Sequence, residues 1–332
     1  MLLTVLLGGT SSERNVSLAS GLRMAAALRE AGHTVRLLDP ATGAIDAATE
    51  AVWRERSVGA APPSAAELSA LRANDQTPTL PTHTLVKDAE CVVLALHGGQ
   101  GEDGTVQALL DVAGVRYTGS GAMATAIAMD KDMTKRILVH AGVPTAAWRM
   151  TPVDSDLAMG ALGLPLIVKP NREGSTVGLT IVKQRDQFEP AVTEAHQFDR
   201  EVMCESFVPG RELTVPVLAG AALPVGEIIP VKEIYDYECK YTPGMAREVF
   251  PAELTPEQTA KVQRFAEQAY VALKLRGCAR IDFRLTAEGQ FFCLEANTLP
   301  GMTALSLVPQ SAAAAGVSFV EFCDSLVKDA VR

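Results

Sequence analysis

Residues 280–285 read RIDFRL and residues 291–297 read FFCLEAN, with the short segment TAEGQ between them. Alternating apolar and polar residues in both segments predict two strands of one hairpin. We expect Asp282 to lie opposite Glu295, a register that centres the turn within TAEGQ. One face of the hairpin would then be apolar, made by Ile281, Phe283, Leu285, Phe292, Leu294 and Ala296.

The polar face of this hairpin is a candidate metal site. The same register places Arg280 opposite Asn297, beside the facing carboxylates of Asp282 and Glu295. Facing carboxylates repel each other unless a cation lies between them. Carboxylate and amide oxygens suit Mg²⁺ that keeps some waters and contacts nucleotide phosphates. The alternative is a solvated polar face, but the facing carboxylates favour a metal site at Asp282, Glu295 and Asn297.

Length and composition indicate an ordinary globular chain. The 332 residues leave room for two or three domains and a sizeable core. Hydrophobic residues make up 48% and charged residues 21%, a balance that argues against extended disorder. The formal net charge of −9 argues against a nucleic-acid partner, although it leaves room for a local basic pocket that binds a nucleotide.

Cysteine spacing and the N-terminus indicate a reducing, cytoplasmic location. The six cysteines include no CxxC pair, and several lie in apolar runs, so we expect buried free thiols. Residues 1–7 are apolar but have no basic region, which predicts a first core strand and not a signal peptide. No apolar run reaches the roughly 18 residues that span a membrane, so we expect no membrane partner.

The first part of the chain has the pattern of an open α/β sheet. The expected elements are a strand at 2–7, a loop at 8–15, a helix to about 31, and strands at 34–38 and 91–96. The last strand leads into the glycine-rich loop HGGQGEDG at 97–104, a position where such folds place ligands. The weakly periodic segment 41–86 is interpreted as an insertion with a helix near 64–73.

From about residue 120 the pattern changes to short strands and separate helices. The expected elements are a helix carrying 129–135, strands at 166–169, 179–182, 202–207 and 212–218, and a helix at 255–275. The loop 170–178 joins two of these strands and contains Gly174-Ser175-Thr176. Backbone N–H groups of such a turn can hold phosphate, and Lys169 at its base adds a positive charge. A plain hairpin turn is the alternative, since no P-loop motif occurs.

Three further features each have a structural alternative. Thr10-Ser11-Ser12-Glu13 fits the capping-box pattern, which would make Glu13 a helix-start residue. His97 ends a buried strand before a glycine-rich loop, a position that leaves a functional role and a purely structural one equally open. The segment 235–241 contains three tyrosines and Lys240, and it is either a mobile flap that bonds a ligand or a cover for apolar surface.

Taken in chain order, these motifs resemble the D-alanine–D-alanine ligases, a family of ATP-grasp enzymes. The resemblance runs from residue 2 to about 316. It rests on GGTSSE at 8–13, HGGxGEDGT at 97–105, YTGSG at 117–121, MDK at 129–131, KPxREGS at 169–175, YDYxxKY at 235–241 and RIDF…EANTxPGMT at 280–303. The last hairpin is shared more widely among ATP-grasp enzymes, whereas the first motif, the tyrosine–lysine segment and PGMTxxS are specific to these ligases.

The resemblance implies the fold and the setting. The fold class is α/β (α+β), an ATP-grasp fold preceded by an open, Rossmann-like α/β domain. The implied domains are 1–119 (N-terminal), 120–208 (central ATP-grasp) and 209–332 (C-terminal ATP-grasp). The family reaction joins two D-alanine molecules with ATP to supply cell-wall peptidoglycan precursors in the cytoplasm, and a homodimer is expected by resemblance.

The resemblance also implies a nucleotide site. Lys131 and Lys169 would contact ATP and its phosphates. The adenine would meet Glu205 and the backbone of Phe207 and Val208, and the ribose hydroxyls would meet Glu212. The metal ligands Asp282, Glu295 and Asn297 would hold two Mg²⁺, for which Mn²⁺ can substitute.

The implied reaction phosphorylates one D-alanine carboxylate, and the amine of a second D-alanine then attacks the acyl phosphate. Arg280 and the Gly301 N–H would stabilise the negative charge that develops. Glu13, Ser175 and Tyr241 would form a hydrogen-bonded set that orients the substrates and the flap.

The implied substrate contacts come from both ends of the chain. Glu13 would hold the first ammonium group, with His97 nearby, and Ser306 and the Leu307 N–H would bind the second carboxylate. Lys240 belongs to the flap. Tyr241 favours the dipeptide, since relatives that form an ester with D-lactate resemble phenylalanine there.

The sequence departs from the family pattern at two positions, and two other functions are possible alternatives. Asn171 and Thr176 replace serines usual in the phosphate loop, so the contacts to ATP depart there from the family pattern. A different ATP-grasp carboxylate–amine ligase is one alternative, opposed by Glu13, Tyr241 and Ser306. A nucleotide-binding protein without catalysis is another, but it would require loss of a metal ligand or of Arg280, and all of these residues are present.

Overall fold

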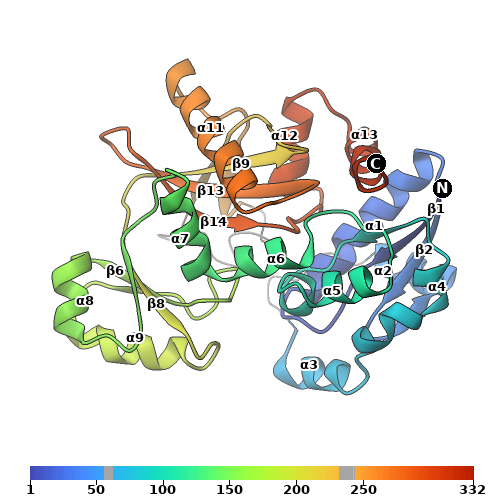
Figure 1. Cartoon of the computed structure of the whole chain (residues 1–332), viewed down its shortest axis with the longest axis horizontal. Coiled ribbons are helices and arrows are strands. Elements are labelled where there is room, and N and C mark those ends of the chain that lie inside the picture. The colour runs from blue at the N-terminus through green and yellow to red at the C-terminus, as the bar shows by residue number, and fades with distance from the viewer. Residues whose placement is uncertain (56–62, 232–241, 243) are drawn as a thin grey trace.

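The computed structural model describes residues 1–55, 63–231, 242 and 244–332. Within this part, the strands form three sheets that lie along the long axis of the molecule (Figure 1). The N-terminal sheet is at one end, a sheet from the middle of the chain is at the other, and the largest sheet lies between and above them in this view.

The N-terminal sheet has the order β3-β2-β1-β4. Its strands are β1 (Leu2–Leu6), β2 (Thr34–Asp39), β3 (Gly43–Ile45) and β4 (Cys91–Leu94). The strand β1 runs parallel to both β2 and β4, and β4 is buried along its whole length. Continuous burial is expected where helices cover a parallel sheet, here α1 (Arg14–Glu30) and α5 (Thr105–Val112) among others. The predicted open α/β sheet is confirmed.

Segment 41–86 is more regular than the sequence indicated. Besides β3 it contains α2 (Ala47–Arg54), α3 (Ala65–Arg72), the 3₁₀ helix η1 (Thr77–Thr82) and α4 (Thr84–Lys87). The helix predicted near 64–73 is confirmed, and Ser64 and Glu67 form a capping box at its start. These helices are short and are set by caps such as Asp46 and Ser64, so they leave little periodicity to detect.

The middle sheet has the order β5-β8-β6-β7. It consists of β5 (Trp148–Met150), β6 (Leu166–Pro170), β7 (Thr180–Val182) and β8 (Val202–Ser206), with α8 (Ser155–Leu162), η3 (Arg185–Gln187) and α9 (Phe188–Ala195). Val168 and Cys204 pack with α8 and α9 on one face. Because side chains alternate along a strand, Lys169 and Glu205 point to the opposite face, where the functional site lies.

The third sheet has the order β12-β11-β9-β13-β14, with β10 paired to β9. It contains β9 (Arg211–Leu218), β10 (Ala221–Ala222), β11 (Gly226–Pro230), β12 (Ala246–Val249), β13 (Cys278–Leu285) and β14 (Phe291–Asn297). One face packs on α6 (Ala122–Met129), α7 (Lys131–His140) and α11 (Pro256–Ala272). The helix predicted at 255–275 is confirmed as α11, which starts with a Thr255–Gln258 capping box and a proline at its first position.

The β13–β14 hairpin has the predicted register only at its open end. Asp282 pairs with Glu295, but a β-bulge follows, and Phe283 pairs with Cys293. The extra residue moves the alternation by one position. The predicted apolar face is therefore wrong at Phe292 and Leu294, since Cys293 occupies the core and Leu294 lines the larger cavity.

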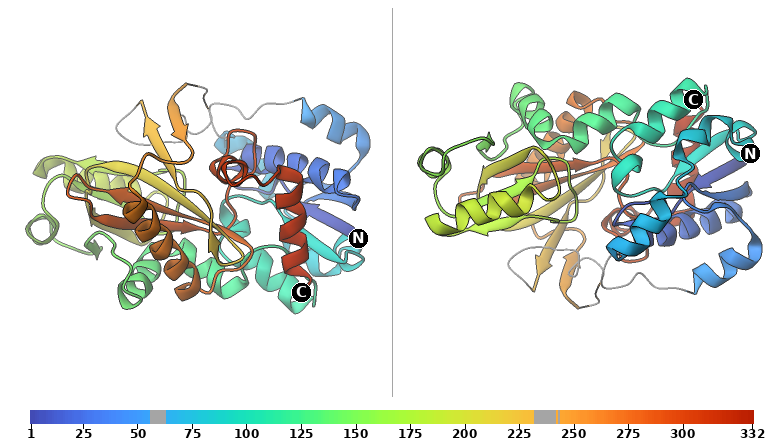
Figure 2. Two further views of the ribbon diagram at one scale, coloured as in Figure 1. Left: turned by 90° about the horizontal axis from the view of Figure 1, so that it is seen from above. Right: turned by 90° about the horizontal axis from the view of Figure 1, so that it is seen from below.

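The C-terminal helices return to the N-terminal sheet. The helices are α12 (Leu307–Ala314) and α13 (Phe319–Ala330), and α13 lies beside α1 (Figure 2). Phe322, Leu326 and Val327 share a core with Leu3 and Leu28. The last helix therefore packs on the N-terminal part of the chain, a feature that no motif indicated. The domain boundaries at 119/120 and 208/209 stay predictions.

Cys91, Cys204, Cys278, Cys293 and Cys323 are buried free thiols, as predicted. Burial raises the pKa of Cys91 and of Cys278 to about 12. Cys239 lies outside the described residues. None of the helices described here is both long and apolar enough to cross a membrane.

Candidate functional site

Two adjacent cavities lie on the inner faces of the sheets. The larger encloses about 1090 Å³ of space between atoms, its open mouth included. Its lining includes Lys131, Lys169, Glu205, Phe207, Val208, Glu212, Arg280, Asp282, Leu294, Glu295 and Leu307. The smaller, of about 680 Å³, is lined by residues that include Glu13, His97, Glu102, Ser175, Asn297 and Gly301.

The two cavities meet at a set of charged and polar residues. Lys131, Glu173, Ser175, Arg280 and Glu295 line both of them. A group bound in one cavity and a group bound in the other can therefore approach each other beside Arg280 and Lys131. Such a junction of two cavities suits group transfer between two ligands.

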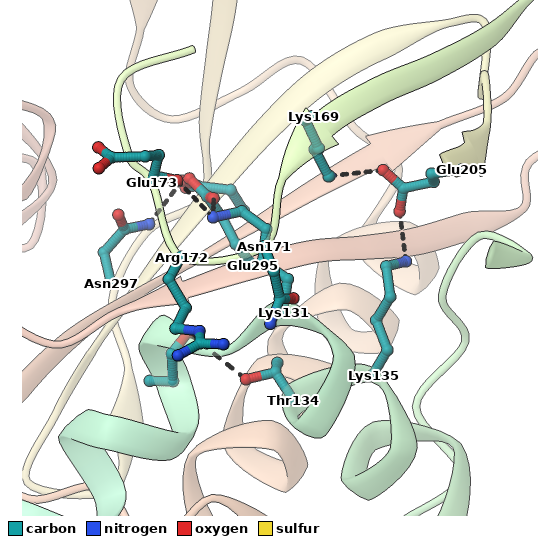
Figure 3. A network of polar contacts seen from close by, with 12 residues as sticks. Lys131, Thr134, Lys135, Lys169, Asn171, Arg172, Glu173, Glu205, Glu295 and Asn297 are labelled. Carbon is teal, nitrogen blue, oxygen red and sulfur yellow. Dashed lines mark hydrogen bonds and ion pairs between the residues drawn. The ribbon is translucent and has the colours of Figure 1, made fainter. Parts of the chain in front are cut away.

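Glu205 is buried between two lysines. Lys169 Nζ donates to Glu205 Oε2 at 2.6 Å, and Lys135 reaches the other carboxylate oxygen from the opposite side (Figure 3). Lys135 is completely buried and also donates to Thr145 Oγ1 at 2.6 Å and to the Ala146 carbonyl at 3.1 Å. The Glu205 carboxylate is thus held by protein groups, and its predicted contact with adenine stays a prediction.

The ionisation of Glu205, Lys135 and Lys169 is mutually dependent. Burial acts to raise the pKa of Glu205, but the charges and hydrogen bonds of Lys169 and Lys135 outweigh it and lower the pKa to about 2. Burial lowers the pKa of Lys135, and the Glu205 charge opposes that shift. Sequence reasoning missed Lys135, although it follows Lys131 by four residues and so lies on the same helix face.

Lys131 joins the phosphate loop to the hairpin. It is the first residue of α7, and its Nζ donates to the Glu173 carbonyl at 2.6 Å. The same ammonium group lies 3.7 Å from Glu295 Oε2. Burial lowers the pKa of Lys131, an effect that the negative charge of Glu295 opposes. The lysine is therefore directed at the junction of the two cavities, as its predicted role requires.

Asp282 is the most constrained carboxylate of the hairpin. It is 7% exposed and accepts hydrogen bonds from Thr214 Oγ1 at 2.7 Å and from Asn297 Nδ2 at 3.0 Å. Arg280 donates to both of its oxygens at 2.8–3.1 Å. The opposite carboxylate, Glu295, is 29% exposed at its side chain. Both carboxylates therefore have a cationic neighbour, which offsets their mutual repulsion.

The chemistry of this donor set fits Mg²⁺. Asp282, Glu295 and Asn297 supply hard oxygen ligands, and Glu295 faces the cavities. The described residues include no group of three His, Cys, Asp or Glu side chains that could hold a metal ion. A metal at this place would therefore rely on the Asn297 oxygen, on waters and on nucleotide phosphates to complete its ligands. The metal assignment stays a prediction.

Glu13 points into the site and does not form the capping box. It precedes α1, and its side chain makes no cap hydrogen bond. Its Oε1 instead accepts from Ser175 Oγ at 2.6 Å, across 162 residues of sequence. Ser175 and Thr176 have positive φ angles of 50° and 60°, a strained conformation for residues other than glycine. The Glu13–Ser175 bond helps to hold the loop in this conformation.

His97 lines the smaller cavity, but both of its ring nitrogens are used by the protein. Nδ1 lies 2.8 Å from the Leu299 carbonyl and Nε2 lies 3.0 Å from Ser20 Oγ. Burial lowers the pKa of His97, against the opposing charge of Glu13, so the ring is held neutral. Both ring nitrogens thus have protein partners, and the predicted place of His97 beside the substrate stays a prediction.

Glu102 is a second residue that sequence reasoning missed. It lines the smaller cavity and accepts from the Gly98 N–H at 2.8 Å. Burial and the nearby charge of Glu13 raise the pKa of Glu102 to about 8. Its neighbour Asp103 is exposed and accepts from the Thr105 N–H. The signal was its place in a glycine-rich loop after a buried strand.

The loop 299–303 and the start of α12 complete the site. Gly301 lines the smaller cavity, and a Cβ at this position would lie 2.8 Å from Ser306 Oγ. Ser306 precedes α12, whose first N–H belongs to Leu307 and has no acceptor within the helix. Glu212 accepts from Arg284 at 3.2 Å at the edge of the larger cavity. Lys240 and Tyr241 lie outside the described residues, so their roles stay predictions.

Comparisons with known proteins agree with this geometry. Two family models match, "D-ala D-ala ligase N-terminus" over residues 3–120 and "D-ala D-ala ligase C-terminus" over residues 137–328. The chain belongs to the D-alanine–D-alanine ligase family. A D-alanine–D-alanine ligase of Syntrophobacter fumaroxidans is 41% identical over 99% of this chain and 97% of its own. These matches confirm the predicted family and enzyme class.

Solved structures of the family have the same fold. The ligase from Coxiella burnetii superposes with a TM-score of 0.81 at 25% identity, over 99% of this chain and 93% of its own. The Bacillus anthracis ligase complexed with ATP gives a TM-score of 0.75 at 29% identity, over 99% and 96%. The predicted ATP-grasp fold class is confirmed.

We predict that Glu205→Gln lowers the free energy of unfolding by about 3 kcal/mol or more at neutral pH, because two lysine charges lose their buried partner. The loss should shrink as the pH falls below about 4, since the stability contributed by a carboxylate with a depressed pKa disappears as it is protonated. Urea unfolding measures both effects. The matched control is Glu194→Gln, at an exposed position on α9, which should change stability by less than about 0.5 kcal/mol. Equal effects of the two substitutions would contradict the assignment.

Proposed function

We propose that this chain ligates two D-alanine molecules to D-alanyl-D-alanine, with conversion of ATP to ADP and phosphate. The observation that carries the proposal is the junction of the two cavities at Lys131, Arg280 and Glu295. A phosphate donor in the larger cavity and an amino acid in the smaller one would meet at this junction. Membership of the ligase family supports the choice of substrate.

ATP would occupy the larger cavity. Phe207, Val208 and Leu294 supply apolar surface for the base, and Glu212 lies at the edge where a ribose hydroxyl would reach it. Lys131 and Lys169 would direct their ammonium groups at the phosphates. Asp282, Glu295 and Asn297 would hold two Mg²⁺ ions, which when bound would neutralise phosphate charge. The relative solved with ATP supports a nucleotide in this fold.

The residues of the chain then account for each chemical step. Glu13, fixed by Ser175, would hold the ammonium group of the first D-alanine, whose carboxylate attacks the γ-phosphate to form an acyl phosphate. The amine of the second D-alanine then attacks the acyl carbon, and phosphate leaves from the tetrahedral intermediate. Arg280, fixed by Asp282, and the Gly301 N–H would stabilise the oxyanion of this intermediate.

The second D-alanine would be held through its carboxylate. Ser306 Oγ and the Leu307 N–H form the start of α12, where the helix dipole favours negative charge. Lys240 and Tyr241 would close the site as a flap, and Tyr241 would favour an amine acceptor over D-lactate. The product would serve peptidoglycan synthesis in the cytoplasm, and the enzyme would act as a homodimer.

The function is tested by ATP-dependent phosphate release with D-alanine, with L-alanine, and with D-alanine plus D-lactate. We expect release with D-alanine alone, background release with L-alanine, and D-alanyl-D-alanine as the product when D-lactate is present. Absence of release with D-alanine would contradict the proposal. Release with L-alanine would indicate a ligase for a different amino acid.

The metal assignment is tested separately by Glu295→Gln. Loss of one carboxylate charge should weaken Mg²⁺ binding and lower turnover at least a hundredfold, while the unfolding midpoint stays close to that of the wild type. Glu288→Gln, in the exposed turn of the same hairpin, is the control and should keep full activity. Full activity of Glu295→Gln would refute the assignment.

A further inference from the structure

The loop 299–303 belongs to the C-terminal part of the chain, but side chains of the N-terminal part hold it. Gly301 of this loop lines the smaller cavity. Three residues bond to its backbone: Ser20 and Arg23 of α1, and His97 after β4. Ser20 is fully buried and His97 is 5% exposed, so the bonds of these two residues are shielded from water.

Arg23 makes two charge-assisted hydrogen bonds to the loop. Its Nη1 donates to the Met302 carbonyl at 2.9 Å and to the Thr303 carbonyl at 2.7 Å. The guanidinium carbon lies 3.7 Å from the ring centre of Phe319, and that ring stacks on Phe322. The guanidinium is therefore fixed on one side by aromatic rings of α13 and on the other by two carbonyls.

Ser20 and His97 form a bridge between two other groups of the same loop. A carbonyl only accepts, so the bond to Leu299 requires a proton on His97 Nδ1. The neutral ring then accepts at Nε2, and Ser20 Oγ–H donates to it. Ser20 Oγ in turn accepts from the Met302 N–H at 3.0 Å. The loop is thereby tied at residues 299 and 302 through one serine and one histidine.

We propose that Arg23 is a positioning residue that, with the Ser20–His97 bridge, holds the 299–303 loop in place for the acceptor half of the reaction. The proposal rests on the proposed function. It gives the two hydrogen bonds of His97 a role in holding the loop, and it assigns Arg23 and Ser20 a role that no motif indicated.

The geometry explains why the acceptor half is affected. The Thr303 N–H donates to Ser306 Oγ at 3.0 Å, and the Thr303 and Ser306 hydroxyls lie 2.8 Å apart. A shift of the Met302 and Thr303 peptides would therefore move Gly301 and Ser306 together. Glu13 is held by Ser175, and Lys169 by Glu205, so the first D-alanine and ATP depend on other contacts.

The test compares Arg23→Met with Arg29→Met. Arg29 is on the same helix, but it bonds Glu50 and the Val35 carbonyl, away from the loop. With saturating ATP, we expect Arg23→Met to raise the KM of the second D-alanine and lower kcat by about tenfold each, the scale of lost charge-assisted bonds. The KM values of ATP and of the first D-alanine should change less than twofold. Arg23→Lys should recover part of the loss, and Arg29→Met should match the wild type.

A second measurement does not depend on turnover. Hydrogen–deuterium exchange of a peptide covering 299–306 should be faster in Arg23→Met and in the milder Ser20→Ala, and unchanged in Arg29→Met. Unchanged exchange in both variants would overturn the proposal, as would equal changes in the KM values of both D-alanines. If both variants exchange faster but the wild-type protein releases no phosphate with D-alanine, the proposed function is refuted and the loop contact still stands.

Discussion

Two carboxylates that face each other across one pair of strands are the constraint on which the site depends. Asp282 and Glu295 are opposite residues of β13 and β14, close to the point where the two cavities meet. Like charges at this spacing require cations nearby. Arg280 bonds Asp282, and Lys131 approaches Glu295 from α7. The hairpin thus determines where positive groups must gather, and a phosphate-transfer site needs positive groups in just such a place.

The same electrostatic logic fixes the other wall of the larger cavity. Glu205 stays ionised in a buried position only because Lys135 and Lys169 flank it, and this pairing holds the Lys169 ammonium at the cavity surface. Lys135 anchors the pair to α7, the helix that also presents Lys131. The residues proposed to contact the nucleotide and those proposed to hold the metal are therefore connected through α7. In the same way, Ser20 and Arg23 of α1 connect the N-terminal part of the chain to the loop 299–303.

The sequence predicted those parts of the molecule that depend on local pattern. The Asp282–Glu295 register, the open α/β sheet and the helix α11 follow from the local pattern of apolar and polar residues. The bulge beyond Asp282 could not be predicted, because it depends on how the two strands pair and not on the residue pattern of either strand alone. The bonds of His97 and the surroundings of Glu102 depend on segments far away in the sequence, so no local motif reports them. The packing of α13 against α1 likewise depends on tertiary contacts between apolar surfaces, which the local sequence does not report.

The central claim is that the hairpin binds the metal ions of a nucleotide site through Asp282, Glu295 and Asn297. Crystals grown with Mn²⁺ and ADP test it directly, because Mn²⁺ gives an anomalous signal that locates each ion. We predict anomalous peaks within coordination distance of these three side chains and of the nucleotide phosphates. Bound ADP with peaks elsewhere, or with none at this hairpin, would contradict the account.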